Sequence, residues 1–142
     1  MTKQDRLSVT TDEGDTMSLE ENKTVVVNFL ENSFIKGNPE QAVADHVGDR
    51  YIQHNPLAPD GAEGFIGFVH WLREQNPKMR FEIKRVIADG DIVVTHSRMT
   101  LSDEQPQRAV ADFFRLEDGR VVEHWDVIQE IPETSANDNG ML

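Results

Sequence analysis

Apolar residues recur at helical spacing in the first half of the chain. A capping box of Ser18 and Glu21 precedes the first apolar stripe, and Gly37 can end it, which predicts a helix from Ser18 to about Lys36. Asn38 as cap and Pro39 at the first helical position predict a short second helix that ends near Gly48. A third apolar stripe predicts a helix over residues 62–75, which is ended by Asn76 and Pro77. The stripe residues are Phe65, Phe68, Val69 and Leu72.

The second half has the pattern of antiparallel strands. β-branched and aromatic residues alternate over 79–88, 91–101, 109–116 and 120–128, and Asp-Gly turns separate the first pair and the last pair. Residues 51–56 are too short for a helix, and we interpret them as an extended polar-aromatic connector. Helices followed by strands predict an α+β fold, with three helices on a strongly curved sheet of about four to six strands. The open end of such a sheet should hold a pocket.

An acidic residue interrupts the most apolar strand. Asp112 alternates in phase with Phe114 and Leu116, so all three side chains should leave on one face. A buried carboxylate has to be hydrogen-bonded, paired, placed in a wet cavity or protonated, and the last two options suggest a pocket. A three-residue loop would set Asp112 opposite His124, whereas a two-residue turn would set it opposite Trp125, and both alternatives remain open.

Composition limits the function classes. The chain has 142 residues and a formal net charge of −12, which argues against nucleic acid and anionic membranes as partners. It contains no cysteine, so thiolate metal sites are excluded, and without a signal-peptide pattern we expect a cytoplasmic protein. We expect one domain over 18–133, between a polar, disordered tail at 1–17 and a polar tail at 134–142. The outer sheet face should form a homodimer through Phe113 and either Val121 or Trp125.

Several motifs together suggest a family. The segments Asp-Phe-Phe-Arg, Asp-Gly-Arg-Val-Val and Glu-His-Trp-Asp follow three predicted helices, and this arrangement resembles the SnoaL-like polyketide cyclase group of the NTF2-like superfamily. The segment Tyr-Ile-Gln-His-Asn-Pro over residues 51–56 is similar to a subgroup described as SnoaL-like aldol-condensation proteins. The resemblance implies an NTF2-like cone with an internal pocket.

The resemblance also implies a reaction and its residues. Asp112 matches the position of the family's acid/base aspartate, and His96 is the candidate for the strand histidine that assists it, with His54 as a second donor. We expect cofactor-independent cyclase or isomerase chemistry on a small hydrophobic carbonyl compound. The expected substrate-binding residues are Tyr51, Asn55, Trp71, Phe114, His124 and Trp125.

Less specific interpretations remain open. Asp112 could serve only as a hydrogen-bond acceptor for His124, and His96 could be a satisfied core histidine. The chain could therefore be a non-catalytic ligand-binding or dimerisation module of the same fold. No short histidine spacing, glycine-rich phosphate loop or Gly-x-Ser-x-Gly elbow is present, so we expect no metal, no cofactor and no hydrolase triad.

Overall fold

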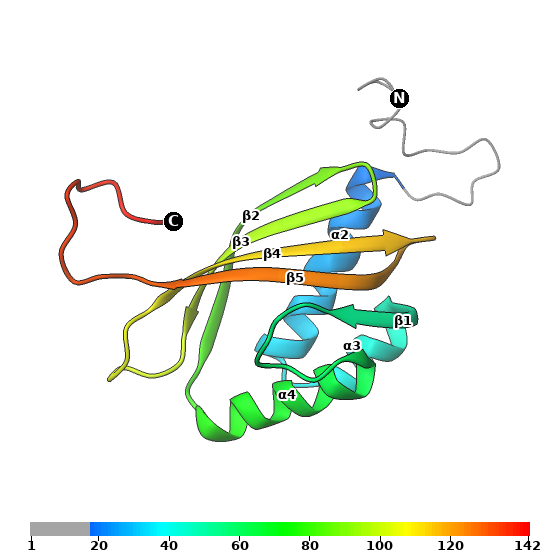
Figure 1. The fold of residues 1–142 in the computed structure, drawn as a ribbon, viewed down its shortest axis with the longest axis horizontal. Helices are drawn as coiled ribbons and strands as arrows, with labels where there is room; N and C mark the ends of the chain where they lie inside the picture. Colours follow the sequence, from blue (N-terminus) through cyan, green and yellow to red (C-terminus); the bar gives the residue numbers. More distant parts are fainter. Residues whose placement is uncertain (1–17) are drawn as a thin grey trace.

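A computed structural model describes residues 18–142 of the chain. The tail predicted at 1–17 lies outside the described residues. In chain order the elements are α2 (Leu19–Leu30), η1 (Glu31–Ile35), α3 (Pro39–His46), β1 (Val47–Gln53), α4 (Gly61–Gln75), β2 (Arg80–Asp89), β3 (Ile92–Thr100), β4 (Arg108–Glu117) and β5 (Arg120–Glu130). Figure 1 shows the helices on one side of a curved sheet, with residues beyond β5 leading away from it. The predicted α+β fold is confirmed.

The helix starts follow the predicted caps. The Ser18 hydroxyl accepts a hydrogen bond from the Glu21 backbone at 3.1 Å, and the Glu21 carboxylate accepts one from the Ser18 backbone at 3.0 Å. Asn38 accepts from the Gln41 backbone at 3.3 Å, with Pro39 at the first turn of α3. The last turn of the first predicted helix, η1, is π-helical. The second helix ends at His46, and Gly48 lies in a strand rather than at the helix end as predicted.

The sheet contains five strands in the order β1-β5-β4-β3-β2. The pairs β2–β3, β3–β4 and β4–β5 are antiparallel, as predicted. β1 pairs with β5 in parallel, so the first half of the segment interpreted as a connector, residues 51–53, belongs to an edge strand. Its pairing partner lies some 70 residues away, as the pair Gln53 and His124 shows, and local pattern carries no signal for such a contact.

The β4–β5 hairpin has neither of the registers considered. A two-residue turn joins Glu117 to Arg120, and Asp118 and Gly119 both have positive φ, of 52° and 76°. Leu116 pairs with Val121 but Arg115 pairs with Glu123, so Val122 is a β-bulge. Beyond the bulge, each β4 residue pairs with the β5 residue one position later than it would in a regular hairpin.

As a result, Asp112 lies opposite Asp126, and Phe114 lies opposite His124. A regular hairpin with this turn would have placed Trp125 opposite Asp112 and turned His124 to the outer face. The bulge therefore delivers both His124 and Asp126 to the face that carries Asp112.

The core lies between the helices and the inner face of the sheet. Phe29 of α2 stacks on Phe65 of α4 with ring centroids 4.8 Å apart, and meets Phe114 of β4 edge-on at 5.9 Å. All three side chains are buried. Among residues 18–142, no helix has both the length and the apolar composition needed to cross a membrane.

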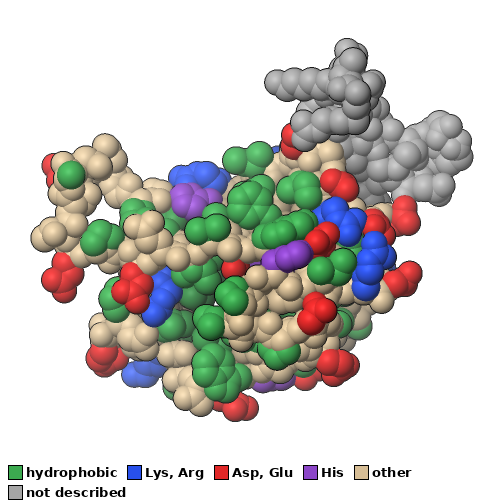
Figure 2. Space-filling model, in the orientation of Figure 1, with side chains coloured by type: hydrophobic (Ala, Val, Ile, Leu, Met, Phe, Trp, Pro, Cys, Tyr) green, Lys and Arg blue, Asp and Glu red, His purple; other side chains and the backbone are tan. Residues whose placement is uncertain are grey.

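The outer face of the sheet retains apolar side chains. Phe113 and Trp125 are cross-strand partners there, and Val127 is 66% exposed. Figure 2 shows apolar side chains gathered over the strands on this side, with charged groups and histidines between them. Val121, one alternative for the predicted dimer face, is instead fully buried in the core. The homodimer itself stays a prediction.

Candidate functional site

A cavity of about 320 Å³ lies between the helices and the inner face of the sheet. Most of its lining is apolar and aromatic, and it includes Phe65, Phe68 and Phe114. Leu57 and Trp71 also line it and are 79% and 55% exposed, so they mark its mouth. A polar cluster lines another part of the wall: Tyr51, Gln53, Asn55, Asp112, His124 and Asp126.

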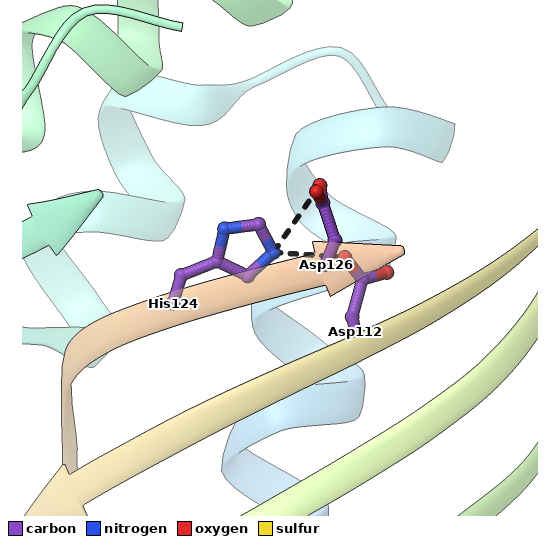
Figure 3. A group of neighbouring side chains, drawn as sticks. All are labelled: Asp112, His124 and Asp126. Carbon is purple, nitrogen blue, oxygen red and sulfur yellow. Dashed lines mark hydrogen bonds and ion pairs between the residues drawn. The ribbon is translucent and has the colours of Figure 1, made fainter. Parts of the chain in front are cut away.

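The centre of the polar cluster is a contact between Asp112 and His124. His124 Nε2 lies 2.8 Å from Asp112 Oδ1 (Figure 3). His124 is only 7% exposed and Asp112 only 5%. The imidazole packs on Phe114, with ring centroids 4.8 Å apart, and on Tyr51 at 6.3 Å. Apolar rings therefore fix its plane while leaving its edge to the carboxylate.

Gln53 determines which nitrogen of His124 carries a proton. Gln53 Oε1 accepts the backbone N–H of Asn55 at 3.0 Å, which identifies this atom as the amide oxygen. The same oxygen lies 2.7 Å from His124 Nδ1, so Nδ1 must donate to it. The contact between Nε2 and Asp112 then contains one proton, held either by the imidazolium or by the carboxylic acid. Such a shared proton is what an acid/base pair requires.

Asp126 is the third ionisable group of the cluster. Its Oδ2 lies 3.8 Å from His124 Nε2 (Figure 3). The same oxygen accepts a hydrogen bond from Asn55 Nδ2 at 2.8 Å. Burial raises the pKa of Asp126; the Asn55 hydrogen bond and the His124 charge act against this rise, whereas the Asp112 charge adds to it. Two carboxyl groups thus face one imidazole, and Asp126 is held toward its neutral form.

Tyr51 contributes a phenol that stays protonated. Burial raises the pKa of Tyr51 well above its ordinary value, the charges of Asp112 and Asp126 add to this effect, and a contact with Gln53 opposes it. No described group makes a regular hydrogen bond to its buried hydroxyl oxygen. The hydroxyl is therefore a donor that remains available in the wall of the cavity.

The same cluster has the composition of a metal site. One ligand atom from each of Asp112, His124 and Asp126 lies within 4.8 Å of the others. The ligands come from two strands, so the short sequence spacings on which we excluded a metal could not reveal them. However, a cation would have to displace the proton between Asp112 and His124, and one further donor, Asn55, already points at Asp126.

Of the residues predicted from sequence, Asp112, Tyr51, Asn55, Trp71, Phe114 and His124 line the cavity. The two predicted assistants do not. His96 alternates with the buried residues of β3, faces outward and contacts Arg85. His54 is exposed, stacks on Trp125 at 4.9 Å and contacts Glu123 at 2.7 Å. Trp125 also lies outside the cavity lining, because the bulge turns it to the outer face.

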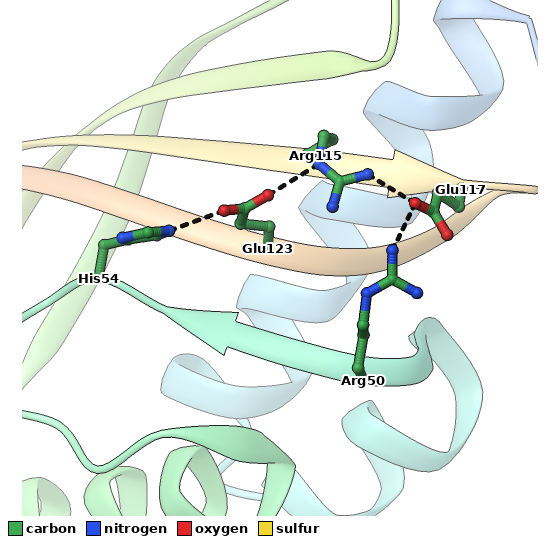
Figure 4. Close-up of polar contacts among 5 residues, drawn as sticks. All are labelled: Arg50, His54, Arg115, Glu117 and Glu123. Carbon is green, nitrogen blue, oxygen red and sulfur yellow. Dashed lines mark hydrogen bonds and ion pairs between the residues drawn. The ribbon is translucent and has the colours of Figure 1, made fainter.

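His54 belongs to a chain of ion pairs on the outer face. Figure 4 shows Glu123 between His54 and Arg115, and Glu117 between Arg115 and Arg50. Hydrogen bonding to His54 and Arg115 lowers the pKa of Glu123. This network ties β1 to the β4–β5 hairpin, so a structural role accounts for His54.

Sequence reasoning missed Gln53 and Asp126 as members of the site. Asp126 follows His124 by two residues, and this alternation signals a shared strand face. Gln53 carries no such signal, because its position depends on the parallel pairing of β1 with β5.

Comparisons with known proteins agree with the fold. Residues 26–124 match the family model described as a SnoaL-like domain. The structure of a "putative polyketide cyclase" from Acidithiobacillus ferrooxidans has a TM-score of 0.65 and 22% identity, over 79% of this chain and 91% of that one. A "putative ketosteroid isomerase" from Kribbella flavida has a TM-score of 0.66 and 16% identity, over 87% and 89%. A comparison with curated protein sequences finds no match.

These identities establish a shared fold rather than a shared reaction. The family match shows which family the chain belongs to, because it runs from α2 to the site histidine on β5 and so covers most of the chain. This protein therefore belongs to the SnoaL-like domain family, within the NTF2-like superfamily.

Proposed function

We propose that this protein is a cofactor-independent enzyme that transfers protons next to a carbonyl group of a small hydrophobic compound. The observation that carries the proposal is the buried Asp112–His124 contact, with one proton between its partners, in the wall of an apolar cavity. The SnoaL-like family and its cyclase-like and isomerase-like structural neighbours support the same class of reaction.

In the proposed reaction, Asp112 acts as the base in its carboxylate form. Its Oδ1 accepts from His124, while no described residue makes a hydrogen bond to Oδ2, which is therefore the oxygen assigned to the substrate. Oδ2 takes a proton from the carbon next to the substrate carbonyl, and the C–H electron pair moves toward the carbonyl oxygen to give an enolate. Imidazolium at His124 balances the charge of Asp112 before the transfer, and the Tyr51 hydroxyl is a nearby donor for the enolate oxygen.

The enolate has two outcomes. Attack on a second carbonyl of the same molecule closes a ring in an aldol reaction, and the alkoxide formed there takes the proton from Asp112. Alternatively, Asp112 returns the proton to a different carbon and gives an isomer. Both outcomes restore Asp112 and consume no cofactor. Aromatic walls favour a flat, apolar substrate, and the raised pKa of Asp126 reduces the negative charge that this residue places beside the enolate.

The variant Asp112→Asn separates an enzyme from a binding module. Asparagine is close in size to aspartate and can still contact His124, but it cannot accept a proton from carbon. We expect the variant to bind cyclic and polyketide-like ketones as the native protein does, and to lose catalysed proton exchange at the carbon beside the carbonyl. Asp49→Asn, at an exposed position of β1, is the matched control. Equal exchange by the native protein and Asp112→Asn would refute the proposal.

A further inference from the structure

Arg108 brings a positive charge to the wall of the cavity. It is the first residue of β4, and it lines the cavity beside Met99, Leu101 and Ile128. Among the described residues that line this cavity, no other is an arginine or a lysine. A guanidinium in apolar surroundings requires acceptors for its five N–H groups.

The protein satisfies these donors incompletely. Arg108 Nη2 contacts Gln105 and Glu130, each at 3.5 Å, which is the outer limit of a hydrogen bond. The Glu130 side chain is 62% exposed, so water weakens that ion pair further. Arg108 Nη1 is buried and has no acceptor among the described residues. The guanidinium therefore has unsatisfied donor capacity for an acceptor supplied from outside the protein.

The cationic and the acidic groups lie at different positions along the cavity wall. Arg108, Val110, Asp112 and Phe114 alternate along the inner face of β4. Four residues of strand separate the α-carbons of Arg108 and Asp112 by roughly 13 Å. The Arg108 side chain is 18% exposed and its strand partner Glu130 is 62% exposed, whereas the Asp112 side chain is 7% exposed, so Arg108 lies nearer to solvent and Asp112 lies deeper.

We infer that Arg108 binds a carboxylate of the substrate near the mouth of the cavity, while the carbonyl end reaches Asp112. The inference deepens the proposed function and depends on it for the reacting end. A carboxylate fits the guanidinium fork with two parallel hydrogen bonds, which a single hydroxyl or ketone oxygen cannot do. The reverse orientation would place the carboxylate next to the Asp112 carboxylate and leave the Arg108 guanidinium without this acceptor. The substrate class is thus a hydrophobic carbonyl acid bound in one direction.

Matched acids and amides test this inference. A series of ω-oxo-ω-phenylalkanoic acids of increasing chain length and their primary amides differ in charge but hardly in size. In calorimetric titration of the native protein, at least one acid should bind with an affinity about tenfold or more above that of its amide. The preference should peak at one chain length, because the distance between Arg108 and Asp112 is fixed by the strand.

Variants of Arg108 test whether this residue causes the preference for acid over amide. Arg108→Met keeps the apolar stem and should lower acid affinity to that of the amide, with amide affinity unchanged. Arg108→Lys keeps the charge without the fork and should give an intermediate preference, which covers the case in which the methionine variant folds poorly. Arg80→Met is the control for loss of one positive charge, because the Arg80 side chain is 60% exposed and lies outside the cavity lining.

Three results would overturn the inference: equal binding of acids and amides by the native protein, a preference that persists in both Arg108 variants, or no binding by any acid of the series. Proton exchange is measured separately on the same compounds. An acid preference that depends on Arg108, without exchange, would refute the proposed function and leave the carboxylate site in place.

Discussion

Gln53 offers a demanding test of the site, because it acts on the chemistry only through His124. In the variant Gln53→Met the side chain keeps its length but loses the acceptor oxygen. Two donors then lack a partner: the ring Nδ1–H of His124 and the backbone N–H of Asn55. An unsatisfied donor costs about 1 to 3 kcal/mol, and Gln53 is only partly buried, so we take the low end for each donor.

The expected loss is therefore about 2 kcal/mol in the free energy of unfolding, or a fall of roughly 6 to 8 °C in Tm for a chain of this size. Urea unfolding measures the first quantity and calorimetry the second. Proton exchange on a bound ketone should fall by about tenfold or more, because the imidazole is no longer held in one protonation pattern against Asp112.

Gln53→Glu is the matched control, since it retains an acceptor oxygen for both donors. Its stability should fall less than that of Gln53→Met. A loss below about 0.5 kcal/mol in Gln53→Met, with unchanged exchange, would refute the assignment of the Nδ1 proton and the positioning role of Gln53.

Other consequences can be measured independently. The raised pKa of Asp126 means that the folded state holds this proton more tightly than the unfolded state does, so the native protein loses stability as pH rises from the ordinary pKa of 3.8 through the folded pKa. Over that pH window, Asp126→Asn should gain stability relative to the native protein in urea unfolding. A stability difference that stays constant across the window would contradict this. Ser18→Ala should cost about 1 kcal/mol through loss of the helix cap, with exchange unchanged. His54→Ala should lower stability but not exchange, since His54 lies on the outer face. Sedimentation at micromolar concentration should show a dimer, and a monomer alone would contradict that prediction.

The features that sequence could predict are local ones. The caps at Ser18 and Asn38, the apolar helix faces, the Asp-Gly turns and the antiparallel strands all depend on residues close together in the chain, and all are confirmed. Asp112 was recognisable because a carboxylate interrupts an apolar alternation. Its place in the cavity wall follows from the same alternation.

The features that sequence reasoning could not reach depend on one bulge and one distant pairing. Val122 shifts the register of β5 by one residue, and no simple pattern distinguishes a bulged Val-Val pair from a regular one. This shift brings His124 and Asp126 to Asp112 and sends Trp125 to the outer face. The parallel pairing of β1 with β5 brings Gln53 and Asn55 to the same place. The expected assistants His54 and His96 rest on the family resemblance, which does not specify strand register, and the structure places both on the outer face of the sheet.

The central claim is that Asp112 removes a proton from carbon. Its most direct test is the incorporation of solvent deuterium beside the carbonyl of a ketone that binds the cavity, compared between the native protein and Asp112→Asn at equal occupancy. We predict incorporation with the native protein and only the uncatalysed rate with the variant. Demonstrated binding without incorporation by the native protein, or equal incorporation by both, would contradict the account.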